Sequence, residues 1–256
     1  MDLKMKLLTG KRPLLGSFLG LPSPPLVEML GYAGYDFVVL DAEHGTFSQE
    51  RMEECVRAAA VVSLPCVVRV ADLEAKLILS ALDSGAEGVQ VPQVETAEQA
   101  RAVVRFSQFP PGGDRGFGST TRAAGYGFRP RPEVRETALR RLVISIQIES
   151  KGGVDHLPAI LGTEGIDVVF IGTSDLSMAY GYDSANDPAM TPLLEKLISG
   201  IHSAGKIPGV HLSDWSKIEY LQRIGVRYFT VSAPAVIKDA FASQAKDFSL
   251  RVNRNV

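Results

Sequence analysis

Residues 142–175 read LVISIQIESKGGVDHLPAILGTEGIDVVFIGTSD and carry the clearest evidence on the fold. The stretch begins with the apolar run Leu142–Glu149, continues with a helical pattern near Val154–Leu161, and ends with a second apolar run, Asp167–Ile171. Both runs are rich in apolar, β-branched residues, which is typical of strands buried on both faces of a parallel sheet. The stretch is therefore predicted to form a strand–helix–strand unit.

The same alternation of apolar runs and amphipathic runs recurs along nearly the whole chain. Six further runs are predicted to be strands: Leu14–Gly20, Asp36–Leu40, Cys66–Val70, Glu87–Val91, Ile207–His211 and Tyr228–Val231. Helical patterns separate and follow them, at Ser23–Ala33, Gln49–Val62, Leu73–Ser84, Ala97–Ser107, Trp215–Ile224 and Pro234–Arg251. Eight strand–helix units predict a (β/α)8 TIM barrel that forms a single domain over residues 1–256. A doubly wound open sheet is the alternative, but no GxGxxG motif follows the first strand.

Residues 108–132 interrupt this alternation with the sequence QFPPGGDRGFGSTTRAAGYGFRPRP. The segment has many glycines, prolines and arginines and little apolar periodicity. Long irregular segments inside a compact domain are usually functional or disordered. Because Phe117, Tyr126 and Phe128 argue against disorder, we interpret the segment as an ordered, flap-like insertion near the top of the barrel. A surface linker is the alternative.

The overall composition favours a soluble enzyme and argues against several other classes. The chain has 256 residues, a net charge of −2 and 45% hydrophobic residues, whereas a nucleic-acid binder usually has a basic excess. Cys55 and Cys66 are too few for a disulfide framework and are expected to be buried. The N-terminal apolar run is too short for a signal peptide, and no run approaches the length of a membrane span. We therefore expect a cytoplasmic protein with neither a nucleic acid nor a membrane as partner.

Polar side chains follow several predicted strands at the end where barrel enzymes carry their chemistry. Any one of them could be merely solvated, but together they would lie on one rim. They are Asp41, Glu43 and His44 after the second strand, Arg69 in the third, Gln147 and Glu149 in the fifth, and Asp175 after the sixth.

Two of these carboxylates suit a divalent cation. Gln147 and Glu149 share one face of a strand, because strand side chains alternate. A carboxylate placed near the barrel interior, as Glu149 would be, is costly to bury unless a cation pairs with it. Asp175 could reach the same point from the next strand. Carboxylates without a nearby cysteine favour a hard ion such as Mg²⁺ or Mn²⁺, although the spacing alone is not a metal signature.

The remaining rim groups suit anion binding and proton transfer. Thr173 or Ser174 is predicted to cap a helix, which would leave backbone N–H groups free to bind a carboxylate or phosphate; an ordinary cap without a ligand is the alternative. His44 suits proton transfer near neutral pH, with Asp41 orienting it. Arg69 stays charged, so we expect it to hold an anion or a developing oxyanion. His211 is the other histidine at this rim.

Several stretches resemble the class II, metal-dependent pyruvate aldolases of the HpcH/HpaI aldolase/citrate lyase family, which includes 4-hydroxy-2-oxoheptanedioate and 2-keto-3-deoxy-sugar-acid aldolases. The resemblance covers roughly residues 14 to 235, and the pairing of QIE with FIGTSDLS is its most specific part. The matching stretches are GSFLGLPSP, DFVVLDAEHG, VVRV, GAEGVQVPQVETAEQAR, PPGGDRGFG, QIESKGGVDHL, GIDVVFIGTSDLSMAYG and HSAGKIPGV.

The resemblance implies a carbon–carbon lyase that cleaves 4-hydroxy-2-oxo acids to pyruvate and an aldehyde, or joins them, through a pyruvate enolate. It implies a divalent metal (Mg²⁺, Mn²⁺ or Co²⁺) on Glu149 and Asp175 that chelates pyruvate, with Gln147 beside it. It implies that Arg69 steadies the enolate oxygen. His44, supported by Asp41, matches the acid/base, and the backbone of Gly172, Thr173, Ser174 and Asp175 would bind the pyruvate carboxylate.

The resemblance also bears on assembly and on the acceptor substrate. It implies a homo-oligomer, a hexamer built as a trimer of dimers that swap the last helix, in which Asp83 reaches the histidine of a neighbouring subunit. The apolar positions in 233–248 fit a swapped helix and an ordinary barrel helix equally well. Departures from the family pattern at Thr46–Phe47, at Thr173 and in the insertion leave the aldehyde open.

Other reactions remain as alternatives. An oxaloacetate decarboxylase or a citrate- or malyl-CoA-type lyase would use the same metal site, and a CoA lyase would need cationic residues such as Arg115, Arg122, Arg129 or Arg131. A Schiff-base aldolase would need a lysine at the upper rim, for which Lys151 is the candidate. A barrel that only binds ligands, without turnover, is the non-enzymatic alternative.

Overall fold

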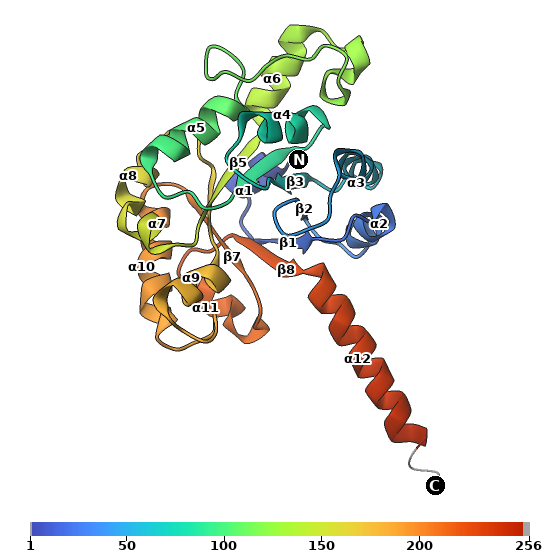
Figure 1. The fold of residues 1–256 in the computed structure, drawn as a ribbon, viewed down its shortest axis with the longest axis vertical. Helices are drawn as coiled ribbons and strands as arrows, with labels where there is room; N and C mark the ends of the chain where they lie inside the picture. Colours follow the sequence, from blue (N-terminus) through green and yellow to red (C-terminus); the bar gives the residue numbers. More distant parts are fainter. Residues whose placement is uncertain (1, 253–256) are drawn as a thin grey trace.

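The computed structural model describes residues 2–252, and its eight parallel strands close into one barrel in the order β1 to β8 (Figure 1). Each strand pairs with the next along the chain, and β8 pairs with β1, so the predicted (β/α)8 TIM barrel is confirmed. The strands are β1 (Leu14–Leu19), β2 (Phe37–Asp41), β3 (Cys66–Arg69), β4 (Gly88–Val91), β5 (Val143–Ile148), β6 (Val168–Ile171), β7 (Ile207–His211) and β8 (Tyr228–Ser232).

Helices surround the barrel and follow the strands as expected for this fold (Figure 1). Those that follow β1 to β8 include α2 (Pro24–Tyr32), α3 (Gln49–Val61), α4 (Ala75–Asp83), α5 (Ala97–Ser107), α7 (Lys151–Asp155), α8 (Leu157–Leu161), α9 (Thr173–Tyr180), α10 (Met190–Ser203), α11 (Ile218–Arg223) and α12 (Ala233–Val252). The predicted helix at Val154–Leu161 is two short helices, because Pro158 lacks an N–H group and stands in the first turn of α8. Two further helices, α1 (Leu3–Thr9) and α6 (Arg131–Arg141), were not predicted.

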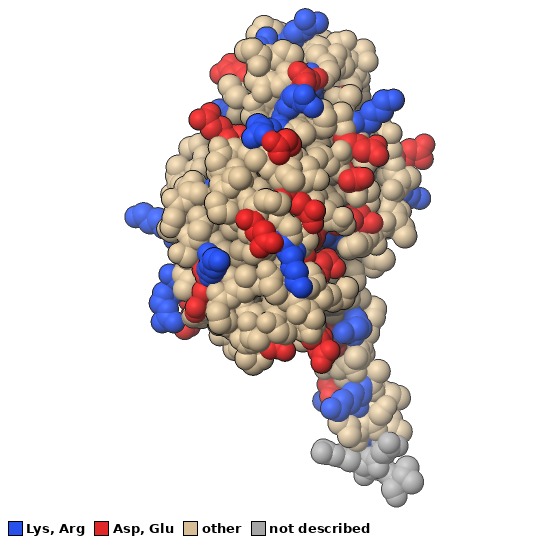
Figure 2. Space-filling model, turned by 60° about the vertical axis from the view of Figure 1, so that its left-hand side comes forward, with Lys and Arg blue, Asp and Glu red and all other residues tan. Residues whose placement is uncertain are grey.

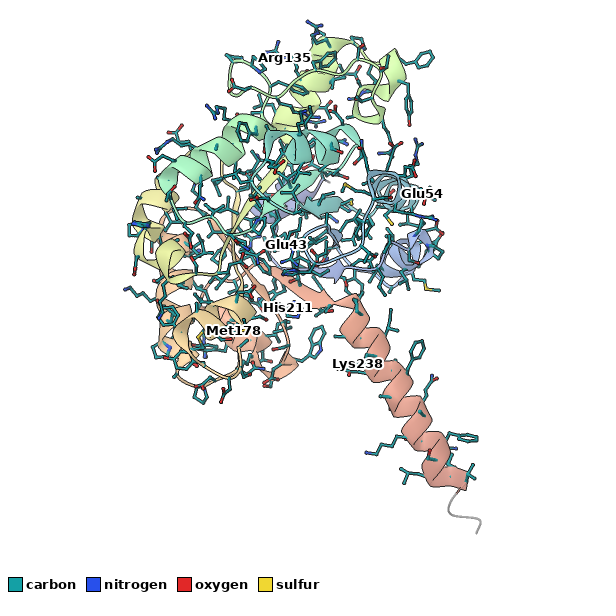
Figure 3. The ribbon with its side chains drawn as sticks, viewed as in Figure 1. Glu43, Glu54, Arg135, Met178, His211 and Lys238 are labelled. Atoms are coloured by element: carbon teal, nitrogen blue, oxygen red, sulfur yellow. The ribbon has the colours of Figure 1, made fainter. Side chains whose placement is uncertain are left out.

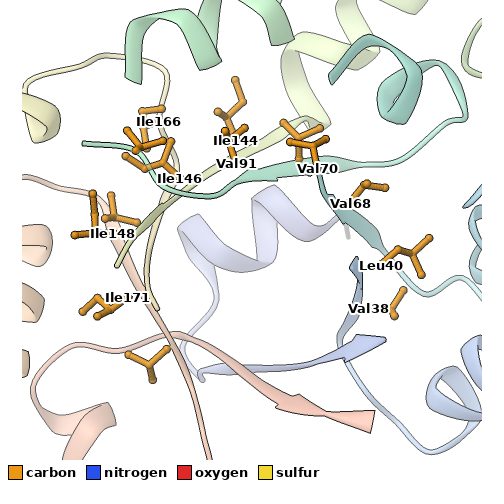
Figure 4. Close-up of a cluster of buried hydrophobic side chains, with 14 of the residues drawn as sticks. Val38, Leu40, Val68, Val70, Val91, Ile144, Ile146, Ile148, Ile166 and Ile171 are labelled. Atoms are coloured by element: carbon orange, nitrogen blue, oxygen red, sulfur yellow. The ribbon is translucent and has the colours of Figure 1, made fainter. Parts of the chain in front are cut away.

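The strands bury their two faces against two different sets of residues. Side chains that point outward pack against the helices, and Figure 4 shows part of this layer, including Val38, Leu40, Val68 and Ile146. Each fully buried aliphatic side chain contributes about 1.5–3 kcal/mol to folding. Side chains that point inward, among them Val39, form a separate cluster that fills the barrel.

Helix α1 closes the end of the barrel opposite the predicted site. Its residues Leu3 and Leu7 are buried and belong to the cluster inside the barrel. The ammonium group of Lys4 lies 2.9 Å from a carboxylate oxygen of Asp167, immediately before β6. Apolar side chains therefore fill this end of the barrel, and the predicted site residues stand at the opposite end.

The insertion at 108–132 is ordered, but our expectation that it lies near the top of the barrel is wrong. The insertion begins where α5 ends. In this fold the connection from a helix to the next strand starts at the end of the barrel opposite the active-site rim. Arg122 donates a hydrogen bond to the carbonyl of Ser84 after α4, and Tyr126 contacts Arg57 of α3. The segment thus lies along α3 and α4, and its arginines do not reach the rim of their own barrel.

Helix α12 points away from the body of the barrel (Figure 1). It leaves large apolar side chains in solvent, including Phe241 and Phe248, which are 68% and 70% exposed. Helix length and hydropathy within residues 2–252 give no candidate for a membrane-crossing segment. On the face shown in Figure 2, positive and negative side chains are mixed, in keeping with the net charge of −2.

Candidate active site

The carboxyl ends of β2 to β6 bring the predicted site residues to one rim. Strand register places Asp41 beside Arg69 and Arg69 beside Gln90. Because strand side chains alternate, Asp41 and Arg69 point into the barrel like the buried Val39 and Val67 two positions before them. Side chains that are distant in sequence therefore meet above the apolar filling of the barrel.

Arg69 is the centre of the charged cluster. Its guanidinium binds both carboxylate oxygens of Asp41, with Nε–Oδ1 and Nη2–Oδ2 distances of 2.9 and 2.7 Å. Its Nη1 lies 2.9 Å from Oε2 of Glu43, and its Cζ lies 4.8 Å from the centre of the Phe18 ring. Two carboxylates and one aromatic face hold the planar group in a single orientation, which suits a residue that must meet an anion.

Asp41 shapes the turn after β2 rather than the imidazole of His44. Its Oδ1 accepts hydrogen bonds from the backbone N–H groups of Glu43 and His44, each at 3.2 Å. The hydrogen bonds that Asp41 makes therefore go to Arg69 and to the backbone, and they correct the expectation that Asp41 orients the His44 ring. The imidazole is 65% exposed, with Nε2 3.9 Å from Oε2 of Glu43.

Glu43 also lies in the charged cluster, although only its place after a strand was noted in the sequence. Its side chain is only 8% exposed and lies between Arg69 and His44. Oε2 has no hydrogen-bond partner of good geometry. Burial raises the pKa of this carboxyl, and Asp175 is among the neighbouring charges that act on it. The site thus holds a buried acceptor whose hydrogen-bonding capacity is not used up by the protein.

Glu149 is a buried carboxylate at the end of β5. Its Oε1 accepts a hydrogen bond of 2.8 Å from the backbone N–H of Gln93, and its Oε2 accepts one from the side-chain amide of Gln147. Burial raises the pKa of Glu149, and the nearby charges of Glu43 and Asp175 add to this effect. A carboxylate in this position is costly as an anion unless a cation neutralises it.

A buried chain of amides fixes the orientation of Glu149. Gln147 donates to Glu149 and accepts a 2.9 Å hydrogen bond from the amide of Gln90. The hydroxyl of Ser145 in turn donates to the side-chain amide oxygen of Gln90 at 3.3 Å. Gln147 therefore positions the Glu149 carboxylate, and its place beside a metal stays a prediction. Gln90 and Gln93 were not predicted, because a glutamine at a strand end carries no distinctive sequence signal.

Helix α9 begins directly beside Glu149. Gly172 is its N-cap and has no side chain to make a capping bond, so the expected caps Thr173 and Ser174 are instead its first two residues. A Cβ atom at Gly172 would lie 2.4 Å from Oε2 of Glu149. Only glycine leaves room for the carboxylate here. The first N–H groups of the helix stay available for an anion.

The residues present fit a divalent cation. Asp175 is exposed in the first turn of α9, and its charge acts on both Glu149 and Glu43. Within residues 2–252, no three acidic, histidine or cysteine side chains converge as a complete ligand set. Two carboxylates that leave most of the coordination shell to water and substrate oxygens suit Mg²⁺ or Mn²⁺ rather than a closed structural site.

Three other candidates make their contacts outside the charged cluster. Lys151 begins α7 and is exposed, with its ammonium group 5.2 Å from the centre of the Tyr180 ring. Asp83 ends α4, where its carboxylate binds Arg115 at 3.0 Å. Arg129 is held by Glu133 and Thr137 beside the insertion. None of these contacts turns the three side chains toward the site of their own barrel.

The sequence of the chain matches a known protein family. The model of the HpcH/HpaI aldolase/citrate lyase family matches residues 14–222. The chain belongs to this family. It is an aldolase, a carbon–carbon lyase, of the pyruvate aldolase type.

Relatives within the family cover almost the whole chain. A hydroxypyruvate/pyruvate aldolase from Paraburkholderia phytofirmans is 32% identical over 86% of this chain and 87% of its own length. A 2-keto-3-deoxy-L-rhamnonate aldolase from Klebsiella pneumoniae is 35% identical over 91% of this chain and 87% of its own. A crystal structure of a family protein from Burkholderia cenocepacia has a TM-score of 0.87 at 32% identity, with 98% of both chains covered.

Proposed function

We propose that the chain is a divalent-metal-dependent aldolase that cleaves 4-hydroxy-2-oxo acids to pyruvate and an aldehyde, or runs the addition in reverse. The observation that carries this proposal is the joint burial of Glu149 and Glu43 beside Arg69 and the start of α9. The names of the relatives support pyruvate or a related 2-oxo acid as the constant half of the reaction.

The start of α9 would bind the carboxylate of the 2-oxo acid. The N–H groups of Thr173, Ser174 and Asp175 lie in the first turn, where they have no partner within the helix. The helix dipole adds a partial positive charge at this end. The carboxylate would then lie next to Glu149, because Gly172 abuts that side chain.

Glu149 and Asp175 would hold the divalent cation, and Gln147 would keep Glu149 in place. When bound, such a cation supplies Lewis-acid stabilisation of negative charge on the substrate, worth several kcal/mol. Mg²⁺, Mn²⁺ and Co²⁺ are the candidates. Glu43 Oε2, which pairs with Arg69 but has no hydrogen bond of good geometry, would accept one from water or substrate in the same space.

Arg69 would stabilise the negative charge on the enolate oxygen, and His44 would transfer the proton of the aldol oxygen. Arg69 is fixed by Asp41, so its guanidinium is ready to donate to an enolate oxygen without reorganisation. His44 is open to solvent at the rim and would move a proton to or from the aldol oxygen. Asp41 acts in this scheme through Arg69 and the 43–44 turn.

The structure favours the short-substrate reaction over a CoA lyase. Arg115 and Arg122 are engaged with Asp83 and the carbonyl of Ser84 on the outside of the barrel. They do not form a cationic binding site for CoA at the rim of their own subunit. Lys151 lies above Tyr180, which does not support the Schiff-base alternative.

We also propose a homo-oligomer in which α12 packs on a neighbouring subunit, with a hexamer as the expected assembly. The exposed apolar side chains of Val236, Phe241 and Phe248 need a partner surface. In that assembly Asp83 would lie against the site of a neighbour, which remains a prediction from the family resemblance.

The test of the proposed function is an assay of pyruvate release. Purified protein with Mg²⁺, Mn²⁺ or Co²⁺ is offered a series of 4-hydroxy-2-oxo acids, and in parallel oxaloacetate and an acyl-CoA substrate. We expect pyruvate from at least one hydroxy-oxo acid at a higher kcat/KM than for oxaloacetate. Turnover confined to oxaloacetate or the acyl-CoA would contradict the proposal and assign the site to the corresponding lyase.

A further inference from the structure

One histidine at the rim has no part in the scheme above. His211 is the last residue of β7, and strand register places it beside Thr230 of β8. Figure 3 shows His211 and Glu43 within the ring of helices, whereas Lys238 lies out on α12. His211 therefore faces the same space as the charged cluster, from the opposite wall.

The imidazole of His211 contacts Thr230 through one ring nitrogen and lies near the ring of Phe18. Nδ1 lies 3.5 Å from the hydroxyl oxygen of Thr230. The ring centre lies 6.4 Å from that of Phe18, which in turn packs edge-on against Phe170 at 5.7 Å. The other ring nitrogen, Nε2, makes no hydrogen bond to the residues that the structure describes and is not enclosed. The free edge of the ring is therefore available to a reactant.

The surroundings keep this ring neutral. Burial lowers the pKa of His211, and the positive charge of Arg69 lowers it further. A neutral imidazole offers one donor and one acceptor, and Thr230 occupies one of them. Such a group is a poor partner for a carboxylate or phosphate, since it brings no charge, but it suits a hydroxyl group.

The position is unusual for a purely structural histidine. The neighbouring interior positions on this side of the barrel are filled by Phe18 and Phe170, and an aliphatic side chain would pack equally well against them. The hydrogen bond between the imidazole and Thr230 is long. A half-buried ring with so little internal bonding points to a partner outside the chain.

We propose that His211 recognises a hydroxyl group on the short 2-oxo acid or aldehyde that reacts at this site, with Phe18 forming the apolar floor beside it. The proposal rests on the proposed aldolase function and deepens it. The anchors for the carboxylate and the enolate oxygen lie on β3, β5 and α9, so the rest of the reactants faces the remaining wall, which includes β7 and β1. Hydroxylated reactants are then preferred over the same molecules without the hydroxyl.

The test compares matched reactant pairs in wild type, His211→Leu and His211→Gln. The first arm compares hydroxypyruvate with pyruvate, each with propanal as the aldehyde. The second arm compares glycolaldehyde with acetaldehyde, each with pyruvate as the 2-oxo acid. The leucine removes the ring nitrogens, whereas the glutamine amide can take the place of Nε2. His202→Leu, an exposed position on α10, is the control. Thermal unfolding checks that each variant is folded.

We expect His211→Leu to lower the ratio of kcat/KM for the hydroxylated over the plain reactant about tenfold, as expected for a lost hydrogen bond, with His211→Gln restoring most of it. A change in the first arm places the hydroxyl on the 2-oxo acid, and a change in the second places it on the aldehyde. An unchanged ratio in both arms, in a folded variant, overturns the proposal. If wild type turns over none of the four pairs, this inference fails, whereas the aldolase function is tested separately by pyruvate release from 4-hydroxy-2-oxo acids.

Discussion

The guanidinium of Arg69 and the carboxylate of Asp41 form a two-pronged ion pair across neighbouring strands, with distances of 2.9 and 2.7 Å. Both side chains are about 10% exposed. The pair fixes an arginine at the centre of the site before any substrate binds. Pre-organised donors of this kind contribute to catalysis because they need not reorganise as charge develops.

Replacing this arginine by lysine should therefore lower activity even though the positive charge is kept. Arg69→Lys loses the planar fork that matches Asp41 and a substrate oxyanion. We expect kcat to fall about 10²-fold, the usual effect of losing one oxyanion donor. Steady-state pyruvate release measures it, with the exposed Arg51→Lys as control. A kcat for Arg69→Lys close to that of wild type would contradict the role of the fork.

Gly172 should be intolerant of even a methyl group. In Gly172→Ala the new Cβ would lie 2.4 Å from Oε2 and 2.7 Å from Cβ of Glu149, so the carboxylate must move. We expect weaker Mn²⁺ binding, on the order of tenfold or more, comparable to mutating a residue that orients a metal ligand. Calorimetric titration with Mn²⁺ measures the dissociation constant directly. Gly200→Ala on α10, where a Cβ meets nothing within 4 Å, is the matched control and should bind Mn²⁺ like wild type.

The buried carboxyl of Glu149 should make the metal-free protein less stable as pH rises. Burial raises its pKa above the ordinary value of 4.5, so the folded chain holds this proton more tightly than the unfolded chain does. The stabilisation is fully present below about pH 4.5 and is lost as pH rises through the folded-state pKa. Burial raises the pKa of Glu43 in the same direction.

Unfolding temperatures of the EDTA-treated wild type and Glu149→Gln over pH 4.5 to 7.5 check this expectation. The Tm of the variant relative to wild type should rise across that range, because glutamine does not ionise. Added Mg²⁺ should raise the Tm of the wild type at neutral pH and leave that of the variant nearly unchanged. A difference in Tm that is the same at every pH would show that the Glu149 carboxyl is not perturbed.

The exposed apolar face of α12 should hold the assembly together. Phe241→Asp combined with Phe248→Asp places charge where burial in a partner is expected. Light scattering after size exclusion should give a hexamer for wild type and smaller species for the double variant. Lys246→Asp, on the same helix, is the control. A monomeric wild type would refute the swapped-helix proposal.

The barrel could be predicted from the sequence because the alternation of apolar strand runs and amphipathic helical runs recurs eight times along the chain. All eight strands lie within one or two residues of their predicted bounds, as Ile207–His211 illustrates. Helix α1 was missed because seven residues carry too little periodicity to stand out. The place of the insertion was misjudged because composition does not say on which end of the barrel a connection starts.

The site was predictable only where residue types are distinctive. Glu149, Asp175, Arg69 and His44 do follow strands, and the structure gathers them at one rim. The partners that decide their geometry were not foreseeable: Asp41 bonds to Arg69 rather than to the His44 ring, and Gln90 supports Glu149 through Gln147. Such contacts depend on how neighbouring strands are aligned and on the direction of each side chain. Neither can be predicted from the residues next to it in the sequence.

The proposed function depends on enolate formation from pyruvate with a metal held by Glu149 and Asp175. Exchange of the pyruvate methyl protons with deuterated water, followed by NMR, tests it without an aldehyde. After treatment with EDTA, we expect exchange to stop, to return with Mg²⁺, Mn²⁺ or Co²⁺, and to stay absent in Glu149→Ala but not in the exposed Glu164→Ala. Exchange that survives EDTA, or that persists in Glu149→Ala with metal, would contradict a metal-stabilised enolate at this site.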